Sequence, residues 1–557
     1  MFKNFSSLGM RWSAYCAGLV ALFITTTVTL HAQSRQEQEV DVNKPVASAS
    51  RIGDLPVVAD KSLITFPEDG PEGEVLPLRV AVQKALGQNL GLRVEAFNQA
   101  ISFESMAIED AVFDSSLFAS VDFYKQELTS TRALASGTST DNRQYGAGIR
   151  KKLSTGATAE LSTGLSRRDS NAALPLSSLD YSADFTASIT QPLLRGGWKT
   201  VNLAGLAKAK SRHEATRLQL KSTIATQIES TENYYWNLAY AYANRKLRES
   251  SREAARNLLT ETEERQRIGM ASDVDVLQAR ASLASREDAI VSATQQIEDA
   301  QDTLARQIGL LQLPEANTAT ATPPMLAVSS LPDTASATPD FSAVWERTVV
   351  WDPSTGVQEE TINQGEIDRR VAKNGLQPSL DLTMAASLLG SDSKYGRQAY
   401  ENAASNDGRE WRTGLTLSYP WGNRGDKARL RQTEKSIEQE KLRLIDLKQG
   451  LYQEVRSTWR QAEAARVRME YTVAAMELQE RNHLQQVEKY RIGLATLREV
   501  IEAQRDLDDA RLTRLNASLS LIRARTALAR LDGTILERHG FTWDEASTIV
   551  ESPSANP

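Results

Sequence analysis

One pattern occurs twice along this chain of 557 residues. Each copy has short segments of alternating apolar and polar residues, a helical stretch of about 65 residues without proline, a glycine tip and a shorter helical stretch. A helix of that length would reach roughly 100 Å, which favours a long, thin molecule over a globular one. The tips are the matching tripeptides Arg267-Ile268-Gly269 and Arg491-Ile492-Gly493.

The spacing within the two copies supports a duplication. The intervals from Pro192 to Gly269 and from Pro420 to Gly493 differ by only about one helical turn. We therefore expect a first repeat over 77–312, with a helix, strands at about 116–191, a long helix at about 198–265, a tip at about 266–272 and a helix at about 273–309. A linker at 313–340 and a second repeat over 341–535 follow, the latter with a helix, strands at about 379–420, a long helix at about 426–490, a tip at about 491–496 and a helix at about 497–531, before a tail at 536–557.

The N-terminus has the layout of a secretory signal peptide. Lys3 and Arg11 precede an apolar stretch from Ala14 to Val28, and small and polar residues follow. The alternative is a membrane anchor, but the stretch is shorter than the roughly 20 residues that a spanning helix needs. We expect cleavage after about residue 32 and an extended or disordered lead-in over 33–76. Cys16 lacks a leucine-led lipobox, so no lipid anchor is expected.

Composition excludes several functional classes. The net charge is −6, and basic residues are interspersed with acidic ones instead of gathered on one face, which argues against nucleic acid as a partner. Cys16 is the only cysteine and would be removed with the signal peptide. His213, His483 and His539 are scattered without metal-ligand spacing, and we interpret them as surface residues. We expect no disulfide, no cysteine nucleophile, no metal site and no cofactor.

The strand-like segments have one apolar and one polar face. Phe185, Ala187 and Ile189 alternate with threonine and serine, as in a transmembrane β-barrel, although a soluble sandwich would alternate similarly. A small sheet in a membrane must close by joining copies of itself, because unpaired edges cannot face hydrocarbon. The helical hairpins also need neighbours on both sides, so a ring of copies would wall a tube. In that tube each long helix would face two shorter helices stacked end to end. One is the helix that follows a tip, and the other is the helix that precedes the strands of the other half.

The strand ends Gln191-Pro192-Leu193-Leu194-Arg195-Gly196-Gly197 and Tyr419-Pro420-Trp421-Gly422, together with both tips, resemble the TolC-like outer-membrane factor family from about Leu76 to Ile535. The resemblance implies an α+β membrane protein in which the duplicated unit gives a trimeric outer-membrane β-barrel continuous with a long periplasmic α-helical coiled-coil barrel. Such a homotrimer is the exit duct of a tripartite efflux or type I secretion system. Its partners are outer-membrane lipid, a periplasmic adaptor (membrane fusion) protein and an inner-membrane pump of RND or ABC type.

The resemblance also implies roles for residues near the tips. The tripeptides Arg267-Ile268-Gly269 and Arg491-Ile492-Gly493 would contact the adaptor, although each glycine can simply terminate a helix. Glu499 and Glu502 would ring the pore constriction, or form a solvated helix face. Asp275 and Tyr490 would form a gate latch. Here the sequence departs from the family, because Ala495 replaces an arginine, and this predicts a weaker or differently wired latch.

Four aromatic residues mark the expected membrane boundary, although they could equally cap a soluble core. The family has four strands per protomer, whereas this chain has four strand-like segments in its first half and two in its second half. We expect four, with the hairpin from Tyr145 to Leu165 as an extension or part of longer strands. A secreted structural coiled-coil protein and a closed porin-like barrel remain alternatives, and the cargo is not encoded. The aromatic residues are Trp198, Trp411, Tyr419 and Trp421.

Overall fold

The computed structural model describes residues 75–127, 139–171, 179–311, 327–328, 337–405 and 408–551. The expected signal peptide and nearly all of the lead-in lie outside these ranges, as does most of the linker at 313–340. All described residues belong to one compact unit that begins at Ser62. Among the described residues, none of the helices combines the length and hydropathy that a membrane crossing requires.

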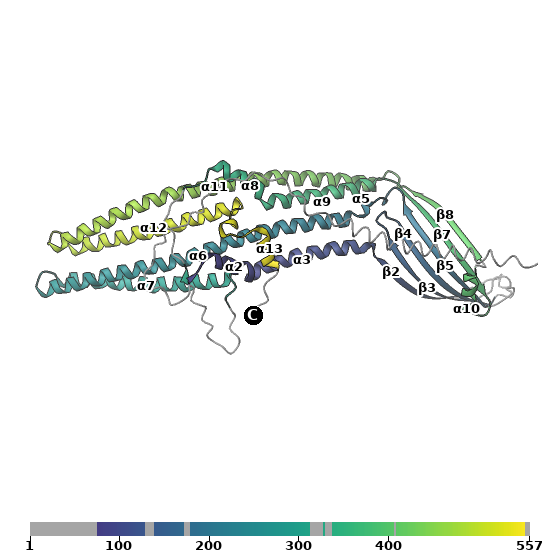
Figure 1. Cartoon of the computed structure of the whole chain (residues 1–557), viewed down its shortest axis with the longest axis horizontal. Helices are drawn as coiled ribbons and strands as arrows, with labels where there is room; N and C mark the ends of the chain where they lie inside the picture. Colours follow the sequence, from purple (N-terminus) through teal and green to yellow (C-terminus); the bar gives the residue numbers. More distant parts are fainter. Residues whose placement is uncertain are drawn as a thin grey trace, which may run out of the picture. The chain divides into compact units, whose positions relative to one another are not determined.

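Four helices form a single layer next to a β-sheet (Figure 1). Their order across the layer is α3, α6, α9 and α11, because neighbouring pairs in this order are in contact. The long helices α6 and α11 have exposed polar faces and buried small or branched residues such as Ala225, Ile228 and Val455. The bounds are α3 (Leu90–Asp110), α6 (Ala204–Arg267), α9 (Pro353–Gly375) and α11 (Arg424–Arg491).

Beyond this layer the two long helices continue with new partners. Helix α7 (Asp273–Gln307) pairs with α6, and α12 (Leu497–Leu531) pairs with α11 and also contacts α6. The N-cap residue of α3, Asn89, donates from Nδ2 to the carbonyl of Gln307 at 2.9 Å, so α7 is stacked end to end on the α2–α3 segment. That segment belongs to the same half of the chain, and the expected stacking on the other half is therefore wrong.

Six strands form the sheet, in the order β2-β3-β4-β5-β7-β8, and every neighbouring pair is antiparallel. The expectation of four strands is wrong, because β3 and β4 are paired along their whole length with both neighbours. The glycine, serine and threonine residues that resembled a loop extension instead lie within these paired strands. The bounds are β2 (Ser115–Glu127), β3 (Ser139–Lys152), β4 (Thr158–Ser170), β5 (Leu179–Pro192), β7 (Ser379–Asp392) and β8 (Gly408–Ser418).

The register places apolar residues on one face of the sheet. Phe185 is aligned with Leu388, Ala187 with Ala386 and Leu161, and Ile189 with Met384. Helix α10 (Gly396–Ala404) covers this face at the end farthest from the helices, where the ring of Tyr400 lies 5.6 Å from that of Phe185. A Cβ atom at Gly390 would meet the α10 backbone at 2.2 Å, so only glycine allows this approach.

Shorter elements pack around the middle of the helices. Trp543 of α13 stacks on Trp351 of α8 at 4.3 Å, and Lys221 Nζ lies 3.8 Å from the centre of the Trp351 ring. The expectation that His539 is a surface residue is wrong, because the C-terminal segment folds back and buries it against Glu232. The bounds are α2 (Leu78–Gln88), α5 (Lys199–Asn202), α8 (Phe341–Trp351), α13 (Trp543–Glu551), the 3-10 turns η1 (Ala111–Phe113) and η2 (Glu537–His539), and the parallel pair β1 (Val75–Leu76) and β6 (Ala327–Val328).

Candidate functional site

The two tips have the same local construction. Gly269 and Gly493 both have a φ of 77°, a left-handed conformation that favours glycine. At the first tip the amide of Met270 donates to the carbonyl of Arg265 and the amide of Gly269 to that of Gln266, which is a Schellman motif. The second tip repeats both bonds with Leu494 and Gly493 as donors. The side chains of Ile268 and Ile492 are exposed at the turns.

The helix that follows each tip begins with a capping box. Asp275 pairs with the N-cap Ser272, and Glu499 pairs in the same way with Thr496. The pKa of both carboxyl groups is lowered, and the main cause is the hydrogen bond that each accepts from the backbone amide of its N-cap residue. Glu502 is exposed and forms an ion pair with Arg498 at 2.9 Å. Asp275 and Glu499 are therefore equivalent capping residues, a role that the motifs Ser-x-x-Asp and Thr-x-x-Glu in the sequence could have indicated.

Arg265 joins the two tips and was not identified from the sequence. Its guanidinium lies 4.2 Å from the centre of the Tyr490 ring and donates to the carbonyl oxygens of Tyr490 at 3.0 Å and Arg491 at 3.3 Å. These carbonyls end α11, where a cation is favoured by the helix dipole. In the described part of the chain, no hydrogen bond joins Asp275 to Tyr490, because the Asp275 carboxylate is bonded to Ser272. Tyr490 instead contacts Arg265 of the other hairpin and is buried in a cluster with Ala279 of α7.

A buried polar cluster joins the same hairpins farther from the tips. The Asp508 carboxylate on α12 accepts from Ser251 Oγ of α6 at 2.5 Å and from Gln504 Nε2 at 3.0 Å. Arg286 of α7 donates from Nε to Ser251 Oγ at 2.9 Å and lies 3.6 Å from Asp508. Burial lowers the pKa of the Arg286 guanidinium. No local sequence motif signals this cluster, because its members lie on three helices that are distant in sequence.

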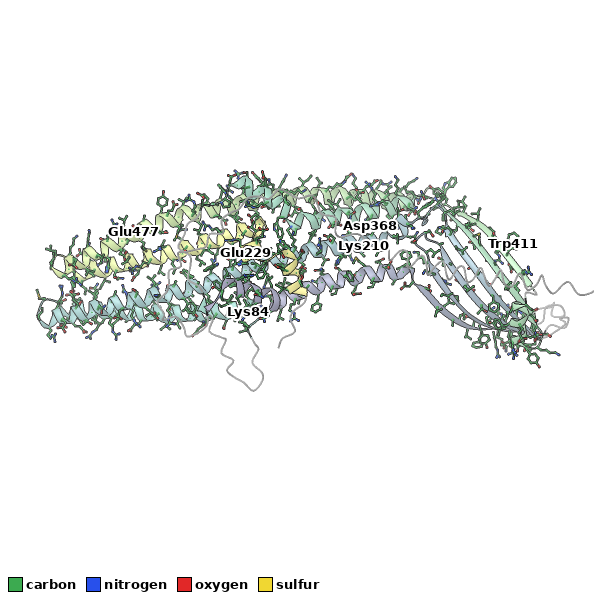
Figure 2. The ribbon with its side chains drawn as sticks, in the orientation of Figure 1. Lys84, Lys210, Glu229, Asp368, Trp411 and Glu477 are labelled. Carbon is green, nitrogen blue, oxygen red and sulfur yellow. The ribbon has the colours of Figure 1, made fainter. Side chains whose placement is uncertain are left out.

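The aromatic residues expected at the membrane boundary are all exposed. Trp198, Tyr419 and Trp421 lie where the sheet meets the helices, and Trp411 lies on β8 (Figure 2). Trp411 is aligned with Ala386 and so lies on the apolar face of the sheet. Aromatic residues therefore lie at the helix end of the sheet, and Trp411 lies on the apolar face farther from the helices. Elsewhere in the described chain, no group of histidine, cysteine, aspartate and glutamate side chains is arranged to hold a metal ion.

Two long segments of the chain match a known protein family. The family model described as "Outer membrane efflux protein" matches residues 81–310 and 357–534, which together are most of the chain. The chain belongs to the outer membrane efflux protein family. The gap between the two matched ranges contains the linker and α8.

Three known proteins illustrate the similarity, at sequence identities of 16–23%. The outer membrane efflux protein BepC of Brucella suis is 23% identical over 358 residues, which cover 64% of this chain and 73% of BepC. The Campylobacter jejuni CmeC outer membrane channel is similar with a TM-score of 0.62 at 16% identity, over 86% of this chain and 89% of that one. The Neisseria gonorrhoeae MtrE outer membrane channel, in its open state, has a TM-score of 0.56 at 16% identity, over 82% and 88%. At these identities the structures establish the shared fold of the efflux protein family.

Proposed function

We propose that three copies of this chain form an exit duct of a tripartite efflux or type I secretion system. The sheets would close a barrel in the outer membrane, and the helices would extend through the periplasm toward an adaptor protein and an inner-membrane pump of RND or ABC type. Export with a cleaved signal peptide and no lipid anchor would deliver the chain there. This proposal rests on the single-layer arrangement of the described helices and strands. At both edges of the layer the outer strand has a paired neighbour on one side only, and the outer helix exposes apolar residues.

The sheet borders are the strands β2 and β8. Each has a partner on only one side in the sheet order, although both are long and carry exposed apolar residues such as Leu117 and Leu415. Edge strands of this kind associate with other strands, and in a bilayer every backbone group must be paired. Joining β8 of one copy to β2 of the next would satisfy both borders. Three copies would close the ring.

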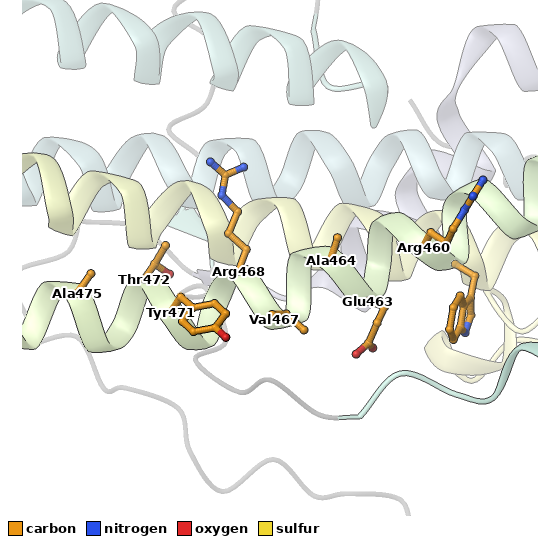
Figure 3. Close-up of a pocket in the computed structure, with 9 residues that line it drawn as sticks. Arg460, Glu463, Ala464, Val467, Arg468, Tyr471, Thr472 and Ala475 are labelled. Carbon is orange, nitrogen blue, oxygen red and sulfur yellow. The ribbon is translucent and has the colours of Figure 1, made fainter.

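Both helix borders of the described chain expose apolar residues. Helix α3 exposes Leu90, Val94, Phe97 and Ile101 at intervals of three and four residues, away from its contact with α6. Helix α11 forms the opposite border and carries a groove of about 720 Å³ along its surface, lined by apolar residues such as Val467 and by charged residues such as Arg460 and Glu463 (Figure 3). A neighbouring copy would bury these surfaces, which water would otherwise contact.

Aromatic residues support the placement of the sheet in the membrane. Trp411 and Tyr419 are separated by about 26 Å along the strand direction at 3.3 Å per residue, which is about 19–22 Å along the membrane normal at a strand tilt of about 35–45° and fits within the roughly 25 Å apolar band of outer-membrane barrels. Between them Leu415 and Leu417 are exposed on the apolar face. Amphipathic rings favour the headgroup level, so Trp198, Trp421 and Tyr419 would mark the periplasmic boundary.

We expect acidic substitutions on the α3 stripe to prevent assembly of the ring. The double variant Phe97→Asp and Ile101→Asp places two charges in the proposed contact, where they would be buried without partners. Trimers on unheated gels and in light scattering should fall at least tenfold, while circular dichroism still reports helices. The control is Asn98→Asp, which adds a charge at an exposed position of the same helix. Unchanged trimers in the double variant would contradict the proposal. Wild-type trimers that conduct no ions would instead favour a structural coiled-coil protein.

The tips would receive the adaptor through Arg267, Ile268 and Gly269 and through Arg491, Ile492 and Gly493. The exposed isoleucines and the exposed Met270 and Leu494 beside them offer apolar contacts at the end of each hairpin. Asp275 and Tyr490 remain the proposed latch residues, with Arg265 as the group that Tyr490 contacts. No reaction is catalysed in this proposal, since the pump supplies the energy.

We expect Glu499 and Glu502 to make the constriction selective for cations. In a trimer they would place six carboxylates around a narrow lumen, where charges are poorly screened. The double variant Glu499→Gln and Glu502→Gln should lower the ratio of potassium to chloride permeability severalfold in planar bilayers. Glutamine preserves the capping geometry of Glu499. The control is Glu477→Gln, which changes an exposed glutamate of α11 that lies farther from the tip. Equal selectivity in the wild type, the double variant and the control would show that Glu499 and Glu502 do not line the constriction.

A further inference from the structure

Two arginines on the apolar face of the sheet lie directly opposite each other. Arg143 of β3 is aligned with Arg167 of β4, and both lie on the same face as Leu161. Like charges in this arrangement repel each other and destabilise a sheet. The polar face of the same two strands has the favourable arrangement, because Arg150 is aligned with Glu160 and bonded to it at 2.8 Å. The arginine pair is therefore a cost that the pairing of β3 with β4 does not require.

Acidic neighbours satisfy the two arginines only in part. Arg143 lies 3.5 Å from Asp141. Arg167 lies 3.6 Å from Asp169, whereas charge-assisted hydrogen bonds are about 2.7–2.9 Å long. The Nε atom of Arg167 is buried and has no hydrogen-bond partner among the described residues. Because each guanidinium has five N–H donors and the two side chains are 41% and 30% exposed, the pair can still bind an anion with several acceptor oxygens.

The height of the pair on the sheet matches the level of lipid headgroups in the proposed barrel. Trp198, at the proposed periplasmic boundary, donates its amide to the carbonyl of Thr155 in the turn before β4. From Thr158, the first residue of β4, to Arg167 the strand extends about 30 Å at 3.3 Å per residue. At a tilt of about 35–45° this is about 21–24 Å along the membrane normal, close to the roughly 25 Å height of the apolar band. The arginines therefore lie at the outer edge of that band.

The apolar face between the arginines and the helix end of the sheet would contact acyl chains. On both strands the residues next to the arginines on this face are uncharged, and the first charged residue toward the helices is Lys151. An amphipathic molecule would fit this surface with its alkyl chains along the strands and an anionic head at the arginines, whereas a free anion would contact the arginines alone. The uncharged residues are Tyr145, Ala147, Ile149, Leu161, Thr163 and Leu165.

Helix α10 bounds the pair on one side. A Cβ atom at Gly396, its first residue, would be 3.1 Å from Leu165 and 3.3 Å from Tyr181. Tyr181 is in turn aligned with Arg167, so α10 begins at the height of the arginines, at the end of the sheet farthest from the helices (Figure 1). The side chain of Arg397 on this helix is 87% exposed. A charged outer surface fits the headgroup region better than the acyl chains, which places the arginines at the same level.

We propose that Arg143 and Arg167 bind the phosphate groups of a lipid in the outer leaflet, with one such site in each copy. This inference rests on the proposed outer-membrane barrel, because the apolar face contacts lipid only there. A phosphate group offers several acceptor oxygens and a negative charge, which guanidinium groups bind in a bidentate manner and which offsets their mutual repulsion. The preferred lipid therefore carries phosphate on its headgroup, and its acyl chains lie along the uncharged residues of β3 and β4.

The test measures lipid binding to the purified trimer. Native mass spectrometry in detergent compares lipid A that carries two phosphate groups with the same lipid A after both have been removed enzymatically. We expect the wild type to bind the phosphorylated lipid at least about tenfold more tightly, and the double variant Arg143→Gln and Arg167→Gln to lose this preference. The control is Arg168→Gln, which removes the adjacent arginine on the polar face and should leave the preference unchanged. Lysine at both positions should retain only part of it.

The outcomes separate this inference from the proposed function. Equal binding of the two lipids to a wild-type trimer that conducts ions would overturn the lipid site and leave the duct intact. Because this comparison uses the unaltered chain, it decides the inference even when the double variant does not fold. Displacement of the bound lipid by inorganic phosphate at an equal concentration would overturn the lipid as the occupant, since the acyl chains would then contribute nothing. A wild type that forms no trimer would contradict the duct and the lipid site together.

Discussion

Replacing Glu232 by alanine is expected to lower the free energy of unfolding by about 2–5 kcal/mol. Glu232 is only 4% exposed, and its two carboxylate oxygens are bonded to His539 at 2.6 Å and to Thr526 at 2.7 Å. The change would leave both of these polar groups buried without their partner. Because His539 belongs to the C-terminal segment, that segment should also become sensitive to protease. Chemical unfolding and limited proteolysis measure the two effects.

The control for this prediction is Glu249→Ala on the same helix. Glu249 is paired with Arg245 at 2.9 Å, but the side chains are 40% and 42% exposed, and such partly solvated pairs contribute less than about 1 kcal/mol. Equal losses of stability in the two variants would show that the buried pair has no special role. A protease-resistant C-terminal segment in Glu232→Ala would contradict the proposed attachment.

The same pair predicts a dependence on pH. Burial raises the pKa of Glu232, but the hydrogen bond and charge of His539 lower it further, and the result lies below the ordinary value of 4.5. A carboxyl group whose pKa is lowered by folding stabilises the folded state above its unfolded pKa, and this contribution is lost as the pH falls through the folded value. The difference in stability between the wild type and Glu232→Gln should therefore shrink below about pH 4.5.

Replacing Arg265 by alanine is expected to open the tips. The change removes a cation–π contact and two charge-assisted hydrogen bonds between the hairpins, together worth about 2–4 kcal/mol. An equilibrium between closed and open tips would shift by at least about tenfold. We expect a corresponding rise in the open fraction of single channels in planar bilayers.

Arg267 provides the matched control for Arg265. It lies two residues closer to the tip glycine, is exposed and forms an ion pair with Glu264 of its own helix. Arg267→Ala should leave the open fraction unchanged. Arg265→Lys should have an intermediate effect, because lysine retains the charge but cannot bond two carbonyls with one planar group. If Arg265→Ala and Arg267→Ala behave alike, Arg265 does not hold the tips closed.

Arg265 illustrates why the gate contacts could not be predicted from the sequence alone. The pairing of Asp275 with Tyr490 came from the family resemblance, whereas the capping motif shows that Asp275 is bonded within its own turn. Arg265 is one of several arginines near the end of α6, and nothing in its local sequence distinguishes it from the others. Its partners lie more than two hundred positions away, and only the packing of one hairpin on the other brings them together.

The repeat of strands, long helix, glycine tip and returning helix was determined by the sequence itself. Each of these features depends on local physics: the periodicity of apolar residues, the left-handed glycine and the capping residues all act within a few positions. The number of strands in the sheet, the burial of His539 and the contacts of Arg265 and Asp508 were decided only by the tertiary structure. Each of them depends on which surfaces meet, and a hairpin rich in glycine and serine can be a loop or part of a sheet until its neighbours are known.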